Sequence, residues 1–157
     1  MKTILVLFAA LVILSLAILP SCKPKVSDEE QIKAAVVEMA KAAEAKDVSA
    51  VKGHISKNYK DPAGNDYNAM KGILAYYFMQ PEGISVFLRE QKVELRGEKG
   101  YDTVRAVISR GGKVDSAVSV LPSEAGGFIL DLTFEKEDGD WMLTSAIWRE
   151  VGVGEAL

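Results

Sequence analysis

Apolar residues at helical spacing dominate the chain just after position 27. They recur every three or four positions from 32 to 43 and therefore share one face of a helix. Ser27 and Glu30 have the spacing of a capping box, in which each side chain accepts a hydrogen bond from the other residue's backbone N–H. The pattern predicts a helix from Asp28 to Lys46. Its apolar positions are Ile32, Ala35, Val36, Met39, Ala40 and Ala43.

Two more helices are predicted before Pro81. Asp47 has the acceptor side chain favoured at a helix N-cap, and a short helix with apolar residues on one face follows it. Residues 59–66 have turn chemistry, with Asp before Pro and then Gly and Asn. A third helix begins near Asp66 and ends near Gln80, because the residue before a proline avoids helical backbone angles.

From Ile84 onward the apolar period changes to two, which is typical of strands. The predicted strands span 84–95, 104–108, 114–121, 128–134 and 141–149. Asp138 and Gly139 form a strong tight-turn signal between the last two strands. Helices followed by antiparallel strands predict an α+β domain, with the N-terminal helices packed on one face of the sheet.

The N-terminus has the layout of a secretory signal. Lys2 is followed by an apolar run from 4 to 19 that only Ser15 interrupts, and then by Leu-Pro-Ser-Cys at 19–22. This tetrapeptide resembles the bacterial lipobox, which implies that residues 1–21 are removed and that Cys22 becomes a lipid-bearing N-terminus. Cys22 is the only cysteine of the chain, so lipidation also explains a lone thiol in an exported protein.

Two alternatives compete with lipidation of Cys22. The apolar run is sixteen residues long, slightly short for an uncleaved membrane helix, which takes about 20 residues. In the second alternative, Cys22 is an ordinary thiol beside an ordinary cleavage site.

If Cys22 is lipidated, three acyl chains would hold the domain at a membrane surface. Lys23 after the cysteine permits passage to an outer membrane, by resemblance to the sorting rule of enteric bacteria. The expected location is the bacterial cell envelope, on the outer membrane facing the periplasm in a diderm.

The mature chain is predicted to have a lipidated tether, 22–26, and a single α+β domain, 27–157. Loss of Lys2 with the leader leaves 18 basic against 22 acidic residues. The sequence has no basic patch interleaved with aromatic residues, so nucleic acid is not an expected partner.

Two local passages carry a family resemblance. One is 55–61, Ile-Ser-Lys-Asn-Tyr-Lys-Asp, with Gly64 following, and the other is the final hairpin, 134–143. With the order of elements, they resemble the nuclear transport factor 2-like (polyketide-cyclase-like) superfamily from about Ser27 to Glu150. The resemblance implies a strongly curved sheet that wraps a long helix into a cone, whose open end often holds a small, largely apolar ligand. Members include isomerases, dehydratases, cyclases and binding modules, so the fold alone does not choose a function.

Tyr59 and Asp61 are the candidate catalytic residues. A carboxylate in an apolar cone has a raised pKa and can move protons at neutral pH, and the family resemblance implies that Tyr and Asp residues can act in this way. In the alternative interpretation, Asp61 is structural, because it directly precedes Pro62 in a turn where Asp commonly binds nearby backbone amides.

The remaining candidates are a histidine and three aromatic residues. His54, the only histidine, lies in the predicted short helix, which favours a surface or packing role over that of a general base. Tyr77, Phe87 and Trp148 are candidate ligand-binding residues in the cone, although large aromatic residues also fill cores. No spacing of metal ligands and no phosphate-binding glycine motif occurs, so neither a metal nor a cofactor is expected.

These observations favour a membrane-anchored, non-catalytic envelope lipoprotein that binds a small apolar ligand or a protein partner. One alternative is an isomerase-like or dehydratase-like enzyme that uses Asp61 and Tyr59 in a cone pocket. Another is a structural or assembly protein that forms a homodimer through the outer face of its sheet.

Overall fold

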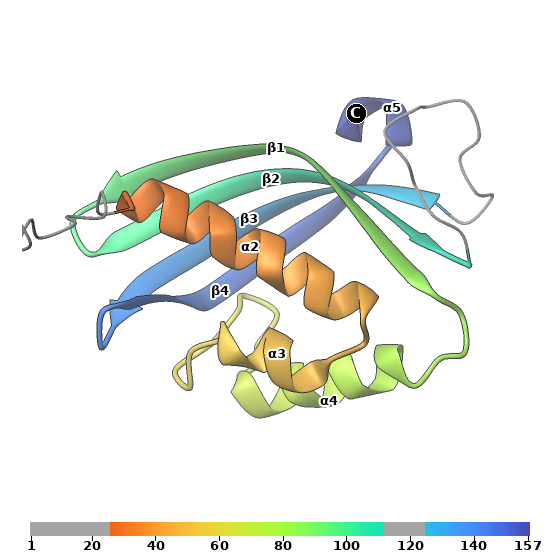
Figure 1. Ribbon diagram of the computed structural model, residues 1–157, viewed down its shortest axis with the longest axis horizontal. Helices are drawn as coiled ribbons and strands as arrows, with labels where there is room; N and C mark the ends of the chain where they lie inside the picture. Colours follow the sequence, from red (N-terminus) through yellow and green to blue (C-terminus); the bar gives the residue numbers. More distant parts are fainter. Residues whose placement is uncertain (1–25, 112–124) are drawn as a thin grey trace, which may run out of the picture.

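A computed structural model describes residues 26–111 and 125–157 of the 157-residue chain. Three helices precede a four-stranded sheet, and one short helix follows it (Figure 1). The elements are α2 (Asp28–Glu44), α3 (Val48–Gly53), α4 (Tyr67–Phe78), β1 (Ile84–Arg96), β2 (Lys99–Arg110), β3 (Ala125–Glu137), β4 (Asp140–Val151) and α5 (Val153–Ala156). The α+β class is therefore confirmed. The strand predicted at 114–121 lies outside the described residues.

The sheet is antiparallel throughout, in the order β1-β2-β3-β4. The register shifts in two places, where Arg89 is the extra residue of β1 and Thr144 is the extra residue of β4. An extra residue at such a bulge bends the strand and increases its twist, and β1 bends visibly along its length (Figure 1). We call the face that packs on α2 the inner face and the opposite one the outer face.

The predicted helix starts are confirmed by their capping contacts. Ser27 and Glu30 form the capping box, with the Ser27 hydroxyl accepting from the Glu30 N–H at 3.2 Å. Asp47 and Asp66 cap α3 and α4, each accepting a backbone N–H at 2.9 Å. The first helix ends at Glu44, earlier than predicted, because Lys46 adopts a left-handed φ of 56° that stops the helix.

The core lies between α2 and the inner face of the sheet. Ile32 and Phe134 are fully buried there, and Trp141 is 5% exposed. Gly100 lets α2 approach β2, because a Cβ at this position would lie 2.3 Å from the Cδ1 atom of Ile32. Bulky apolar residues facing a glycine thus set the spacing between helix and sheet.

The outer face is partly covered by α5, an element that the sequence did not predict. Ala156 is fully buried against β3, where a Cβ on Gly127 would lie 2.8 Å from the Gly152 carbonyl oxygen. Arg105 and Arg89 donate hydrogen bonds to carbonyl oxygens of the C-terminal segment, at 2.7 Å each. The chain end is therefore folded back over β2 and β3.

Helix α4 is the least buried of the three N-terminal helices, since it has no buried residue, whereas α2 and α3 each have at least one. Its apolar side chains Met70, Leu74 and Phe78 pack against the core while staying partly exposed. Within the described ranges, no helix has both the length and the apolar character needed to cross a bilayer.

Candidate functional site

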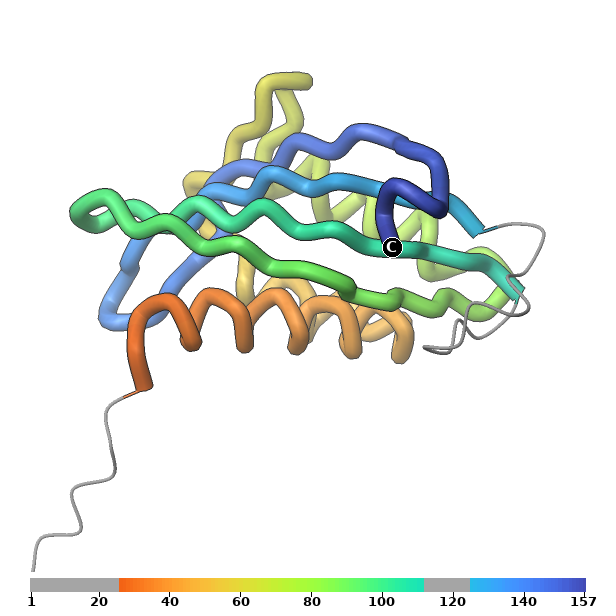
Figure 2. The backbone as a smooth tube through the Cα atoms, turned by 90° about the horizontal axis from the view of Figure 1, so that it is seen from above, coloured from red at the N-terminus to blue at the C-terminus, as the bar shows by residue number. Residues whose placement is uncertain are grey.

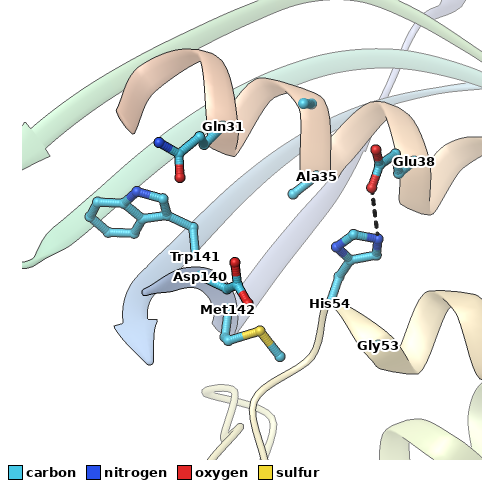
Figure 3. A pocket seen from close by; sticks show the side chains of 9 residues that line it. Gln31, Ala35, Glu38, Gly53, His54, Asp140, Trp141 and Met142 are labelled. Atoms are coloured by element: carbon cyan, nitrogen blue, oxygen red, sulfur yellow. Dashed lines mark ion pairs between the residues drawn. The ribbon is translucent and has the colours of Figure 1, made fainter. Parts of the chain in front are cut away.

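A groove of about 380 Å³ lies between α2, the end of α3 and the start of β4 (Figure 3). We call it the proximal groove. Gln31 and Glu38 line it from α2, and Asp140 and Met142 line it from β4. His54 lies between them at the C-cap of α3. The groove thus brings together polar side chains from three elements.

His54 makes two contacts that tie elements together. Its Nε2 atom lies 3.3 Å from the Glu38 carboxylate, an ion pair when the imidazole is protonated (Figure 3). Its carbonyl oxygen accepts from the Leu143 N–H at 2.8 Å, which joins the end of α3 to β4. No hydrogen bond or ion pair joins His54 to Asp140, and no group of three possible metal ligands occurs among the described residues. These contacts support a structural role for His54.

Tyr59 and Asp61, the candidate catalytic residues, are brought together in the structure. Both are buried, and the Tyr59 hydroxyl donates to Asp61 Oδ2 at 3.3 Å. Asn65 donates twice to the same carboxylate, from its backbone N–H to Oδ1 and from its side chain to Oδ2, at 2.9 Å each. The Asp61 N–H in turn donates to the Asn65 carbonyl at 3.0 Å. The carboxylate therefore closes its own turn.

The electrostatics of this pair follow from the same contacts. Burial alone acts to raise the pKa of Asp61, but the Asn65 donors, with help from Tyr59, hold that pKa below its usual range. Burial and the neighbouring Asp61 charge raise the pKa of the Tyr59 hydroxyl well above its usual range. An ionised Asp61 beside a firmly protonated Tyr59 suits an anchored turn better than proton transfer near neutral pH.

The segment before this turn, from Ser56 to Lys60, is hydrogen-bonded to β4. Ser56 donates to the Leu143 carbonyl and Lys60 donates to the Thr144 carbonyl, at 2.9 Å each. The segment covers the exposed edge of β4 up to Thr144 and then leaves it at Asp61. An edge strand that is covered in this way cannot pair with another chain at the same place.

A second groove, also of about 380 Å³, lies on the inner face at the end of the sheet remote from the start of α2. We call it the distal groove. Ile108, Gly126 and Phe128 form an apolar floor, with Arg110 on β2 and Glu150 on β4. A Cβ on Gly126 would lie 2.8 Å from the Phe128 ring, so the glycine makes room for that ring.

The three predicted ligand-binding aromatics occupy different surfaces. Trp148 is 48% exposed on the inner face opposite Leu130. Tyr77 is 44% exposed on α4, with the Arg110 guanidinium 5.2 Å from its ring centroid. Phe87 points to the outer face, because it pairs with Val107 in the register. The structure thus places Tyr77 and Trp148 on the inner side and separates Phe87 from them.

Sequence reasoning missed Asp102, a carboxylate buried in the core. It is 1% exposed on the inner face of β2, and neither carboxylate oxygen has a hydrogen-bond partner among the described residues. The Nε2 atom of Gln91, diagonally across on β1, is also buried without a partner in the described part of the chain. Burial raises the pKa of Asp102 to about 6, although the charge of Lys33 and the backbone N–H of Lys92 oppose the rise. The sequence contained one indication, because Asp102 is two residues before Val104 and therefore lies on the same face of the strand.

Comparisons with known proteins identify the fold class. No family model and no curated protein matches the sequence. Among solved structures, a candidate dehydratase of the nuclear transport factor 2-like family from Streptomyces avermitilis superposes with a TM-score of 0.65 at 18% identity, over 79% of this chain and 97% of that one. A CaMKII hub from S. rosetta superposes with a TM-score of 0.61 at 15% identity, over 80% and 98% of the two chains.

A third similar structure is Bd1075 of Bdellovibrio bacteriovorus, with a TM-score of 0.63 at 10% identity. The alignment covers 78% of this chain but only 41% of Bd1075. At these identities the similarity defines a nuclear transport factor 2-like fold. It leaves the function to be argued from the chain's own residues.

Proposed function

We propose that this protein is a lipid-anchored, non-catalytic binding protein of the bacterial cell envelope, and that it holds a small, largely apolar ligand in the distal groove. The observation that carries the proposal is incomplete burial on the inner face. Phe128 and Ile108 stay partly exposed in the groove, while Leu74 and Phe78 of α4 are only partly buried nearby in the fold.

Incomplete burial supports a ligand because a ligand that covers apolar surface removes it from water, which is favourable by about 25 cal/mol per Å². A groove of about 380 Å³ also falls within the size range of small-molecule sites. Arg110 and Glu150 place one charge of each sign among its lining residues. Such a site suits an apolar molecule with a polar end.

The non-catalytic part rests on how the candidate acid–base groups are engaged. The Asp61 carboxylate accepts three hydrogen bonds from its own turn and from Tyr59. His54 pairs with Glu38, and its backbone is bonded to β4. Turnover of a steroid-like or polyketide-like substrate that is lost in Asp61→Asn would favour the enzyme instead.

The anchor rests on the sequence, in which the apolar leader ends in Leu-Pro-Ser-Cys at 19–22. Cys22 would carry the acyl chains, and the bilayer would be the protein's first partner. Mass spectrometry of protein purified from its host tests this directly. A mature N-terminus at acylated Cys22 is expected, whereas a free thiol or a retained leader contradicts the anchor.

The ligand site can be tested with an environment-sensitive apolar fluorophore titrated into the mature chain. Ile108→Asn in the distal groove should weaken binding at least tenfold. The matched variant Ile147→Asn lies on the outer face, where Ile147 is 51% exposed, and should leave binding unchanged. Equal effects of the two substitutions would contradict the assignment of the site.

A second candidate function is assembly through the outer face. Tyr101 and Ile147 are exposed there, at 37% and 51%, around a groove of about 270 Å³. The similarity to a CaMKII hub adds to this candidate. Mass measurement in solution tests it, because a strict monomer at all concentrations contradicts a homodimer.

A further inference from the structure

We infer that the domain stands on the membrane with its two hairpin turns toward the lipid and its distal groove toward the aqueous space. The inference rests on the proposed lipid anchor at Cys22. It adds an interaction surface, the hairpin end of the sheet facing lipid headgroups, and it makes the distal groove accessible from water instead of from the bilayer.

The first step is the attachment of the start of α2. The Asp28 carboxylate accepts from Lys136 Nζ at 2.7 Å and from Trp141 Nε1 at 3.1 Å. These donors come from β3 and β4 on either side of the β3–β4 turn. The point at which the tether enters the domain is therefore bonded to that hairpin.

The second step is the shape of the domain. The β1–β2 turn, the β3–β4 turn and the start of α2 lie at one end in two perpendicular views (Figures 1 and 2). The distal groove lies at the other end, where β2 finishes at Arg110 and β3 begins at Ala125. β1 alone has 13 residues, or roughly 43 Å at 3.3 Å per residue.

The third step is the length of the tether. Five residue steps separate Cys22 from Ser27, which span at most about 18 Å when fully extended. That is less than half the length of β1. The hairpin end therefore stays close to the lipid whatever the tether does, and the groove reaches the membrane only if the domain lies on its side.

The fourth step is the charge of α2, which opposes an orientation in which the domain lies on its side on the membrane. The exposed surface of α2 is acidic, and an anionic leaflet repels it. Its charged residues are Asp28, Glu29, Glu30, Glu38 and Glu44 against Lys33 and Lys41. At the hairpin end, Lys99 lies 2.7 Å from Glu135 and Arg96 lies 2.9 Å from Glu94, so the cations there are already paired. The tether, and not lipid charge, sets the orientation.

Fluorescent labels at the two ends of β1 test the orientation. The natural Cys22 is blocked by its thioether in the anchored protein, so an introduced cysteine is a unique label site. Glu98→Cys lies in the β1–β2 turn and Glu82→Cys lies just before β1, and both positions are exposed. In vesicles with nitroxide-labelled headgroups, we expect the label at 98 to be quenched at least threefold more than the label at 82.

Equal quenching at 82 and 98, or stronger quenching at 82, would overturn the orientation and would indicate a domain lying on its helices. Flotation of the native protein with vesicles reports separately on the anchor. If flotation fails, a chain in which residues 1–19 are removed and six histidines replace residues 20–25, and with them Cys22, is bound to vesicles of nickel-chelating lipid. The ratio of the two labels then tests the orientation alone, and the same two results support or overturn it.

Discussion

The Cδ1 atom of Ile32 lies only 2.3 Å from the position that a β-carbon on Gly100 would take. Ile32 is fully buried, so its side chain has little room to turn aside. The contact joins the first turns of α2 to β2. It fixes the position of the helix at the end of the domain where α2 begins.

Gly100→Ala is therefore expected to destabilise the protein by about 1–3 kcal/mol through overpacking. Ile32→Val removes the clashing methyl group and alone should cost about 0.5–1.5 kcal/mol. In the Gly100→Ala background the same change should cost less or stabilise. Denaturant unfolding of the four proteins measures this, and additive effects would contradict the contact.

Gly72→Ala provides an opposite case on α4. A Cβ there meets nothing within 4 Å, and alanine favours a helix over glycine by about 1 kcal/mol. The substitution should raise the free energy of unfolding by up to that amount. A loss of stability measured by denaturant unfolding would contradict the open space beside Gly72.

Asp61→Ala should destabilise the fold by about 2–3 kcal/mol, because Tyr59 and Asn65 lose a charged acceptor. Since the folded pKa of Asp61 is lowered, its stabilisation is complete above the usual Asp pKa and is lost as the pH falls through the folded value. Acid unfolding of the variant should thus depend less on pH. Asp140→Ala, at an exposed position, serves as the control and should change stability by less than about 0.5 kcal/mol.

Asp102→Asn should show the reverse pH dependence. The folded pKa of Asp102, about 6, exceeds its usual value of 3.8, so the folded state binds the proton more tightly. The cost of its charge is absent near pH 3, grows between pH 4 and 6 and is complete above pH 6, at about 3 kcal/mol. The difference in unfolding free energy between the variant and the natural protein should therefore shift in favour of the variant by about 3 kcal/mol between pH 3 and pH 8. Asp138→Asn in the exposed turn is the control, and an equal gain there would refute the assignment.

Gly127→Ala should displace α5. The added methyl group meets the Gly152 carbonyl at 2.8 Å and the Ala156 Cβ at 2.9 Å, and a backbone atom cannot rotate away. Hydrogen exchange at residues 153–157 should accelerate while the sheet stays protected. Gly154→Ala meets nothing within 4 Å and should leave the exchange unchanged. Unchanged exchange in Gly127→Ala would show that α5 is not held at this contact.

Much of the fold could be predicted because its signals are local. The caps at Ser27, Asp47 and Asp66 need only a few neighbouring residues, and the Asp138–Gly139 turn needs only backbone conformation, with φ values of 51° and 101°. The structural interpretation of Asp61 also needs only one turn, in which its carboxylate accepts the Asn65 N–H. These interactions form within a segment, so the segment's residues suffice to indicate them.

The amino-acid sequence by itself thus determined most of the element types, the helix starts and the turns, and the proposed lipidation of Cys22 rests on the sequence alone. Only the tertiary structure decided which faces were covered. The bulge after Leu88 adds one residue to β1, so the residues on the inner face have even numbers before the bulge and odd numbers after it. Phe87, which precedes the bulge, therefore points to the outer face. The burial of Asp102 and the docking of Ala156 depend on partners far along the chain. Alternation fixes two faces for a strand, and long-range packing chooses which one becomes the interior.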